Sequence, residues 1–357
     1  MNASAKIDIP SLSEVIRQYP CSQNTAQHIA QSRHTISQIF KGQDDRLLVV
    51  IGPCSIHDIE ASLEYAHKLV NIAANYNQQL HIVMRTYFEK PRTTVGWKGL
   101  IFDPYLDGSD DLITGLFTAR KLLVDINDLG LSTATEFLDV TSFFYLSDLM
   151  SWGAIGARTT ESQVHRQMAS GLNCPIGFKN GTDGNITIAA DAMTSAAHPH
   201  LYPMPDFNGG MCAVKSKGNT TCHAIMRGGK QPNYYHQDIT AAEALLKSRD
   251  LCTKIMVDCS HGNSRKLHLN QLRVVEDLCR QLAHGSSAVA AIMAESFLRS
   301  GNQSLNTNHS LRSTPLNYGQ SITDACIGWS DTERLLDMLA EGVESRRKMR
   351  QLEQFLV

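Results

Sequence analysis

Short apolar runs recur along the chain, and each is followed by a polar loop and then by a longer segment with helical spacing. Runs of this kind are typical of buried parallel strands. In one intervening segment, residues 112–126, apolar side chains recur every three or four positions and Gly130 follows as a helix stop. The eight candidate strands cover residues 46–52, 81–88, 132–138, 154–159, 174–180, 223–229, 254–261 and 288–296.

Alternating strands and helices predict βα units around a parallel sheet, and eight units suit a closed (β/α)8 TIM barrel. An open doubly wound sheet is the alternative, but no GxGxxG turn follows the first run, so its dinucleotide-binding form lacks support. We assign the catalytic barrel to residues 46–357. Residues 1–45 should form an N-terminal extension for oligomerisation or regulation, or simple surface decoration. Residues 199–220 should form a short inserted β-hairpin.

Charge and cysteine content exclude several classes of protein. The chain has 33 Lys and Arg against 35 Asp and Glu, so no overall field favours nucleic acid or a membrane, and any anion site must be built locally. The first residues lack a secretion signal and no apolar stretch is long enough to span a bilayer, which predicts a cytoplasmic protein. Nine cysteines without a CxxC pair argue against a disulfide framework and a finger-type zinc site.

Each candidate strand ends at, or just before, a side chain that is charged or can bind a metal. Barrel enzymes carry their chemistry at the C-terminal ends of the strands, so these side chains should surround one opening. They are Cys54, Arg85, Glu136, Arg158, Lys179, Arg227, His261 and Glu295.

Cations crowded around one opening cost Coulomb energy unless anions bind there. A substrate that carries phosphate and carboxylate groups is therefore implied, because Arg binds both with paired hydrogen bonds. A lysine among such cations should have a depressed pKa and could move a proton. The clustered cations are Arg85, Lys90, Arg92, Arg158, Lys179 and Arg227.

Four of the residues near the strand ends offer sulfur, nitrogen and oxygen ligands to one divalent metal ion. These are Cys54, His261, Glu295 and Asp324, which lies in the following loop. The mixture suits manganese, iron, cobalt or zinc better than magnesium alone. Taken singly, Cys54 could be a buried core thiol, His261 a satisfied core histidine and Asp324 a turn or helix cap.

Seven long motifs, in this order, resemble those of the type I 3-deoxy-D-arabino-heptulosonate 7-phosphate (DAHP) synthases, which are regulated by aromatic amino acids. The resemblance spans nearly the whole chain. The motifs are GPCSIHD (52–58), FEKPRTTVGWKG (88–99), GARTTES (156–162), GFKNGTDG (177–184), RGGKQPNY (227–234), DCSHGNS (258–264) and SITDACIGW (321–329).

The resemblance implies a transferase that joins phosphoenolpyruvate to erythrose 4-phosphate and releases phosphate, at the start of aromatic amino-acid synthesis. It implies one divalent metal on Cys54, His261, Glu295 and Asp324. It also implies that Arg85, Lys90, Arg158, Lys179 and Arg227 bind phosphoenolpyruvate, and that Arg92 and Thr93 bind the sugar phosphate.

The implied chemistry is attack of C3 of phosphoenolpyruvate on the aldehyde carbon, which the metal polarises. Water then adds at C2 and phosphate leaves. Catalytic roles fall to Lys90, His261 and Cys54. Lys90 is the candidate proton donor to the new alkoxide, because neighbouring cations should depress its pKa, and metal-bound water or His261 is the alternative.

Members of this family are commonly inhibited by an aromatic amino acid bound beside an N-terminal arm. The matching regions here are 139–144, 168–173 and 202–214. Phe143 stands where the phenylalanine- and tyrosine-sensitive branches usually carry Pro, and Pro203 and Met204 occupy a stretch that helps select the effector. Similarity over the chain favours tryptophan, with an insensitive enzyme as the alternative. A homodimer or homotetramer is expected.

Three other functions compete with this hypothesis. A synthase for 3-deoxy-octulosonate 8-phosphate shares the chemistry, but the KPRTT segment argues against it. A Schiff-base aldolase using Lys179 would need no metal. A non-catalytic sensor of aromatic amino acids would not need the complete ligand set. We also expect Cys326 to lie near Cys54, so that oxidation would link the two and expel the metal.

Overall fold

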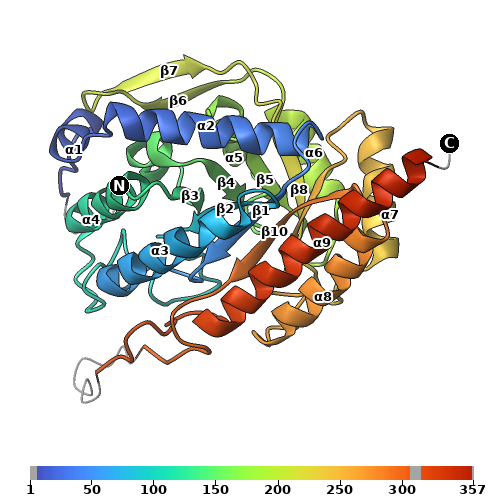
Figure 1. Cartoon of the computed structure of the whole chain (residues 1–357). Coiled ribbons are helices and arrows are strands. Elements are labelled where there is room, and N and C mark those ends of the chain that lie inside the picture. The colour runs from blue at the N-terminus through green and yellow to red at the C-terminus, as the bar shows by residue number, and fades with distance from the viewer. Residues whose placement is uncertain (1–5, 306–314, 356–357) are drawn as a thin grey trace.

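The computed structural model describes residues 6–305 and 315–355. In these residues eight parallel strands close a barrel in the order β1-β10-β9-β8-β5-β4-β3-β2, with helices packed around it (Figure 1). The prediction of a (β/α)8 barrel is confirmed. The barrel strands are β1 (Leu47–Gly52), β2 (Leu80–Arg85), β3 (Ser132–Glu136), β4 (Trp152–Ile155), β5 (Ile176–Lys179), β8 (Cys222–Met226), β9 (Ile255–Asp258) and β10 (Val289–Glu295).

An α-helix follows every barrel strand except β3. After β3 the chain forms only two short 3-10 helices, η2 (Ser142–Tyr145) and η3 (Ser147–Leu149), and a third, η1 (Ala74–Tyr76), follows α3. The barrel helices are α3 (Ile59–Ala73), α4 (Leu112–Asp128), α5 (Gln163–Gly171), α6 (Thr187–Ala196), α7 (His236–Ser248), α8 (Asn270–Ala283) and α9 (Trp329–Phe355).

Local signals set several helix ends. The side chain of Asp58 accepts a hydrogen bond from the backbone N–H of Ala61 and so caps α3. Asp111 caps α4 in the same way through Thr114. Beyond α4, Gly130 adopts a φ of 80°, the left-handed conformation in which helices commonly end.

The N-terminal extension contains α1 (Leu12–Gln18) and α2 (Gln23–Phe40), and α2 closes the barrel at the N-terminal ends of its strands. Phe40 stacks on the ring of His223 at the start of β8, with 3.5 Å between ring centroids. Ser32 forms a hydrogen bond of 2.9 Å with His81 on β2. The last turns of α2 therefore pack into the barrel interior through Ile36, Ile39 and Phe40.

The predicted insertion contains an antiparallel hairpin outside the barrel, formed by β6 (Leu201–Pro205) and β7 (Met211–Lys215). Its turn contacts α1, because the backbone N–H of Ser13 donates to the carbonyl of Phe207 at 3.0 Å. In Figure 1 the hairpin lies alongside α2. Within the described parts of the chain, no helix is both long and apolar enough to cross a membrane.

Several strands end earlier than their apolar runs predicted. β2 ends at Arg85 and not at residue 88, and β9 ends at Asp258 and not at His261. His261 has a φ of 53°, which no strand accommodates. The apolar run continues past the strand end because most of these residues are still buried. The strand itself ends where its backbone hydrogen bonds to the neighbouring strands stop. The residues beyond that point form loops over the barrel mouth.

Candidate functional site

A cavity of about 370 Å³ opens at the C-terminal ends of the barrel strands. All six cations that the sequence predicted to gather there line it. A seventh, Lys266 on the loop from β9 to α8, also lines it and was not foreseen. Glu136 and Asp324 are the carboxylates among its described lining residues. The cations are Arg85, Lys90, Arg92, Arg158, Lys179, Arg227 and Lys266.

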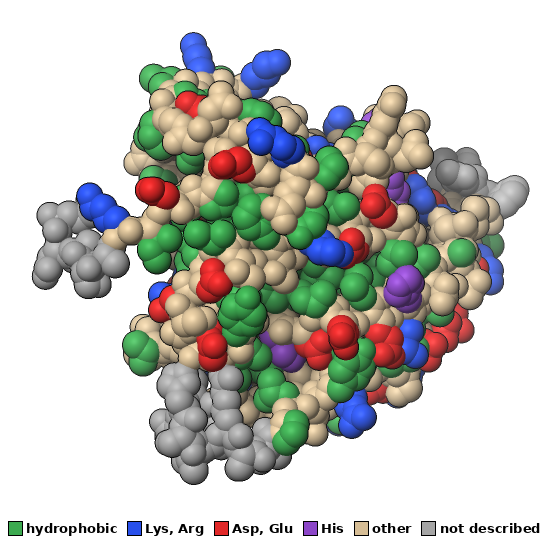
Figure 2. All heavy atoms as spheres, turned by 90° about the vertical axis from the view of Figure 1, so that its left-hand side faces the viewer, with side chains coloured by type: hydrophobic (Ala, Val, Ile, Leu, Met, Phe, Trp, Pro, Cys, Tyr) green, Lys and Arg blue, Asp and Glu red, His purple; other side chains and the backbone are tan. Residues whose placement is uncertain are grey.

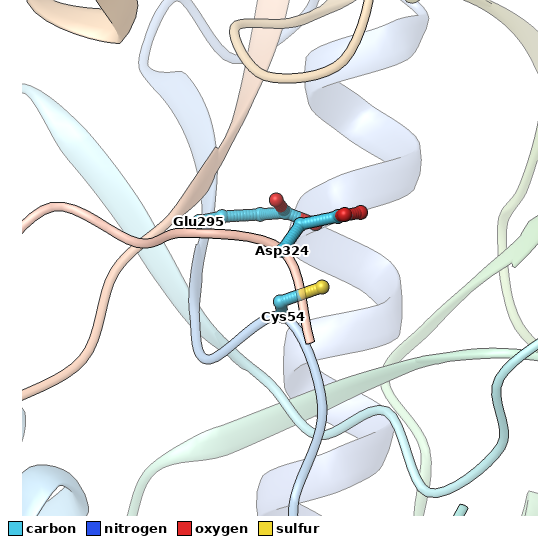
Figure 3. A group of neighbouring side chains, drawn as sticks. All are labelled: Cys54, Glu295 and Asp324. Carbon is cyan, nitrogen blue, oxygen red and sulfur yellow. The ribbon is translucent and has the colours of Figure 1, made fainter. Parts of the chain in front are cut away.

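Three of the four predicted metal ligands form a compact group next to this cavity. The ligand atoms of Cys54, Glu295 and Asp324 all lie within 4.8 Å of one another. Figure 3 shows the three side chains converging, Cys54 from the loop after β1, Glu295 from the end of β10 and Asp324 from the loop before α9. Gly52, the last residue of β1, lets β1 approach β2 closely, because a Cβ there would lie 2.7 Å from the carbonyl oxygen of Arg85.

His261 lines the same cavity but lies outside the 4.8 Å group. Its Nδ1 atom lies 2.9 Å from a carboxylate oxygen of Asp258 and 2.7 Å from the hydroxyl of Ser260. A carboxylate at one ring nitrogen is the usual support of a metal-binding histidine. Because Nδ1 is engaged, a bond from His261 to a metal would use Nε2.

The charges around Cys54 favour a bound cation. Burial and then the negative charge of Glu295 raise the pKa of the Cys54 thiol, while Lys90 and Arg85 oppose the shift. Burial opposes ionisation of Asp324 as well, but Lys90, His261, Lys266 and Arg85 together lower its pKa. A buried thiol beside two carboxylates gains its thiolate form when a cation joins it. The donor set therefore fits one divalent metal ion.

Lys90 lies directly over this group, with its Nζ atom 3.1 Å from the sulfur of Cys54. Burial by itself would lower the pKa of Lys90, but the charges of Cys54, Glu295 and Asp324 outweigh it and the pKa is raised. The expectation of a depressed pKa was wrong. It counted the neighbouring cations, whereas the opposite charges of the ligand group act more strongly than Arg85.

Two buried ion pairs hold the cavity floor. Arg85 donates to Glu295 at 3.0 Å, and Lys179 donates to Asp258 at 3.0 Å, with all four side chains almost completely buried. Burial opposes ionisation of Asp258, but Lys179 and His261 hold its pKa well below the usual range. The sequence interpretation missed Asp258. Its signal was an acidic residue at the end of a buried strand, three positions before His261.

The remaining predicted residues are placed less uniformly. Arg158 and Arg227 line the cavity, as does Arg92, whose Nε atom donates to the carbonyl of Trp97 at 2.7 Å. Thr93 is exposed and is absent from the described lining residues. The structure thus gathers the predicted cations but does not bring Thr93 to the cavity wall.

A second cavity, also of about 370 Å³, lies between the N-terminal extension and the barrel. The three regions expected to bind an effector all contribute to it, through Phe143 and Phe144, through residues 171–173, and through the hairpin. Helices α1 and α2 and the short helix η3 supply the rest of the wall. The effector prediction therefore corresponds to a real hollow in the described structure.

Residues 19–337 match the sequence profile described as the DAHP synthetase I family. The chain belongs to this family. It is 55% identical over 333 residues to the tryptophan-sensitive phospho-2-dehydro-3-deoxyheptonate aldolase of Escherichia coli K12, covering 93% of this chain and 94% of that protein. The phenylalanine-sensitive protein of the same strain is 53% identical over the same shares of the two chains.

A solved structure agrees with this assignment. The phospho-2-dehydro-3-deoxyheptonate aldolase of Francisella tularensis SCHU S4 superimposes with a TM-score of 0.93 at 45% identity, covering 97% of this chain and 99% of that chain. The tryptophan-sensitive protein of Salmonella typhimurium LT2 is 53% identical over 344 residues, which are 96% of this chain and 97% of that protein. The barrel fold and family membership rest on sequence and structure alike.

Proposed function

We propose that this enzyme condenses phosphoenolpyruvate with erythrose 4-phosphate to give DAHP and phosphate. The observation that carries the proposal is a cavity lined by seven cations and lying next to a group of one thiol and two carboxylates, in a chain 53–55% identical to phospho-2-dehydro-3-deoxyheptonate aldolases. Both substrates are phosphate esters, and such a cavity favours anions over neutral sugars.

The cations divide between two sides of the barrel mouth. Arg158 follows β4, Lys179 ends β5 and Arg227 follows β8, three neighbouring strands, and we assign the phosphate and carboxylate of phosphoenolpyruvate to this side. The opposite side, at β1 and β10, carries Cys54 and Glu295. The sugar aldehyde belongs there, so that C3 of phosphoenolpyruvate faces the aldehyde carbon.

We assign one divalent ion, of manganese, iron, cobalt or zinc, to Cys54, Glu295, Asp324 and His261. When bound, it would supply Lewis acidity at the aldehyde oxygen. Lys90, above the sulfur of Cys54, holds a proton within reach of that oxygen and donates it as the carbon–carbon bond forms. Water then adds at C2, and the C2–O bond to phosphate breaks.

The Schiff-base alternative is disfavoured by the surroundings of Lys179. A nucleophilic amine must be free and neutral, yet this one donates to Asp258 inside the protein. The pair instead suits binding of a substrate anion. Borohydride added with DAHP, the ketone from which a Schiff-base lysine would form its imine, should therefore leave the protein unmodified and active after dialysis.

We further propose that tryptophan binds in the second cavity and inhibits the enzyme. Phe143, Phe144, Tyr202 and Met204 supply apolar walls that suit an indole ring. The tryptophan-sensitive relatives support this choice of effector. Half-maximal inhibition by tryptophan at a lower concentration than by phenylalanine or tyrosine is expected, and the reverse order would refute it.

We propose homo-oligomer formation through the hairpin and the segment before α1. Leu201 and Met211 are each 68% exposed, Ile7 is 74% exposed and Phe207 is 52% exposed. Figure 2 shows the face on the left-hand side of Figure 1, where hydrophobic side chains lie among charges of both signs. Exposed apolar area of this kind marks contact surfaces. Leu201→Lys should lower the mass measured by light scattering during gel filtration, and an unchanged mass would count against this surface.

The direct test of the reaction follows the ultraviolet absorbance of phosphoenolpyruvate after erythrose 4-phosphate is added. Consumption that a chelator abolishes and manganese restores is the expected result. Consumption unaffected by chelator would overturn the metal assignment. If only a five-carbon sugar phosphate is consumed, the octulosonate synthase alternative holds.

The ligand assignment has its own test. Asp324→Ala should weaken manganese binding, measured by calorimetry on the purified protein, by roughly tenfold or more, since one charged ligand is lost. Asp331→Ala, in the first turn of α9, is the matched control. Equal manganese affinity in the two variants would remove Asp324 from the ligand set.

A further inference from the structure

Lys266 is a cation at the mouth of the cavity to which the proposed reaction assigns no role. It lies on the loop from β9 to α8. This loop lies beside the metal group, because β9 pairs with β10, the strand that carries Glu295. Arg92 lies on the loop after β2, which pairs with β1 on the other side. Strands β1 and β10, which lead to Cys54 and Glu295, therefore stand between the loops of Arg92 and Lys266.

The ammonium group of Lys266 is available to a ligand. Within residues 6–305 and 315–355 its side chain makes no hydrogen bond and no ion pair, and the residue is exposed. By contrast, Arg85 and Lys179 at the cavity floor are each held by a buried carboxylate. Lys266 lines the same cavity as Asp324, and its strand β9 lies beside β10, on the metal side of the mouth.

The loop that presents Lys266 has an unusual backbone. His261, Arg265 and Lys266 all have positive φ, at 53°, 52° and 60°. Each such residue costs roughly 1–2 kcal/mol relative to the right-handed conformation. Strain of this kind persists where the surrounding structure enforces it, most often at functional sites. The backbone N–H of Lys266 donates to the carbonyl of His261 at 2.9 Å and closes the turn toward the cavity.

The second substrate needs a cation on this side of the barrel. Its aldehyde lies at the metal group, so its phosphate must be neutralised nearby, whereas Arg158, Lys179 and Arg227 serve the other side. Arg92 supplies one charge, but its Nε atom is held by the carbonyl of Trp97. A phosphate dianion beside a single exposed guanidinium would remain undercompensated.

We propose that Lys266 binds the phosphate group of the aldehyde substrate, opposite Arg92, and so sets specificity for phosphorylated sugars. The inference rests on the proposed function, since it assumes an aldehyde phosphate as second substrate. Lys266 is a binding residue here and takes no part in proton transfer. Its removal should weaken binding of that substrate and spare phosphoenolpyruvate.

The test compares Lys266→Gln and Lys266→Arg with Arg265→Gln. Arg265 is the matched control, because it is an exposed cation of the same strained loop and is absent from the described cavity lining. In Lys266→Gln, KM for erythrose 4-phosphate should rise roughly tenfold or more, as loss of a charge-assisted hydrogen bond implies. KM for phosphoenolpyruvate should change less than twofold. Lys266→Arg should recover most of the loss.

A binding measurement separates this inference from the proposed reaction. Glycerol 3-phosphate carries the phosphate ester without the aldehyde, and its calorimetric affinity should fall in Lys266→Gln but not in Arg265→Gln. Equal affinities and equal KM values in the two variants would overturn the role of Lys266. A rise confined to KM for phosphoenolpyruvate would overturn it as well. A wild-type protein that consumes no phosphoenolpyruvate, yet shows the affinity difference, would refute only the reaction.

Discussion

Glu89 carries a buried carboxyl group whose ionisation should make the stability of the protein depend on pH. It follows β2, one position before Lys90, and is 6% exposed. The hydroxyl of Ser142 donates to it at 3.0 Å. Burial, and then the charges of Asp139 and Glu136, raise the pKa of Glu89 from 4.5 to about 7, against the opposing hydrogen bonds.

The sign follows from which state binds the proton more tightly. Because the folded pKa is the higher one, the folded protein holds the proton between pH 4.5 and 7 after the unfolded chain has lost it. Stability therefore falls as pH rises through this window. The full shift corresponds to about 3 kcal/mol, of which about 2 kcal/mol lies between pH 5.5 and 8.5.

The perturbation is Glu89→Gln, which keeps an oxygen for Ser142 and cannot ionise. Relative to the wild type, the variant should gain about 2 kcal/mol in free energy of unfolding on going from pH 5.5 to pH 8.5. Urea unfolding followed by tryptophan fluorescence at the two pH values measures this difference. Glu353→Gln, which changes an exposed carboxylate near the end of α9, is the matched control.

A difference between Glu89→Gln and the wild type that is the same at both pH values would refute the reasoning. Glu89 would then ionise alike in the folded and unfolded states. A difference that falls with rising pH would mean that the carboxylate form is stabilised by its hydrogen bonds with Ser142 and Asp139. Parallel behaviour of Glu353→Gln would assign the pH dependence to the surface as a whole.

Three further outcomes follow from the structure. Phe40→Ala should cost about 3–5 kcal/mol of unfolding free energy, measured with urea, because a buried ring at the barrel floor is lost; a loss under 1 kcal/mol would show that the floor refills. Lys179→Met should cost about 3–5 kcal/mol, since it leaves the buried Asp258 without its lysine partner, and the double change with Asp258→Leu should recover part of this. Cys326→Ser should slow peroxide inactivation several-fold in a timed activity assay, because the backbone N–H of Cys54 already donates to the sulfur of Cys326 at 3.4 Å; equal rates would exclude a disulfide between the two.

Much of the barrel was predictable because its signals are local. Buried parallel strands are rich in apolar and β-branched residues, and the chain shows one such run for each of the eight strands. The segment between β3 and β4 does not follow this pattern of alternating strands and helices. There η2 and η3 replace a helix, Phe143 is buried, and Arg120 on α4 donates to the carbonyl of Tyr145 at 2.7 Å. The packing of α2 against the N-terminal end of the barrel could not be predicted from the sequence either, because it depends on where the closed barrel leaves an opening.

The site was predictable in its membership but not in its pairing. Strand ends carry Arg85, Lys179 and Glu295, and barrel closure must bring them to one mouth. The partners of these cations belong to strands far apart in sequence, so the pairs with Glu295 and Asp258 appear only in three dimensions. The wrong pKa expectation for Lys90 has the same origin, since distances to anions decide its direction.

The amino-acid sequence by itself determined the fold, the family and most of the reactive residues, because periodicity and motif order are properties of the chain in one dimension. Tertiary structure alone decided which charges meet. It brought the ligand atoms of Cys54, Glu295 and Asp324 within 4.8 Å of one another and paired His261 with Asp258. It also placed Lys266 at the cavity mouth, with its backbone in the left-handed conformation. Electrostatic interaction depends on separation and burial, and neither quantity exists until the barrel has closed.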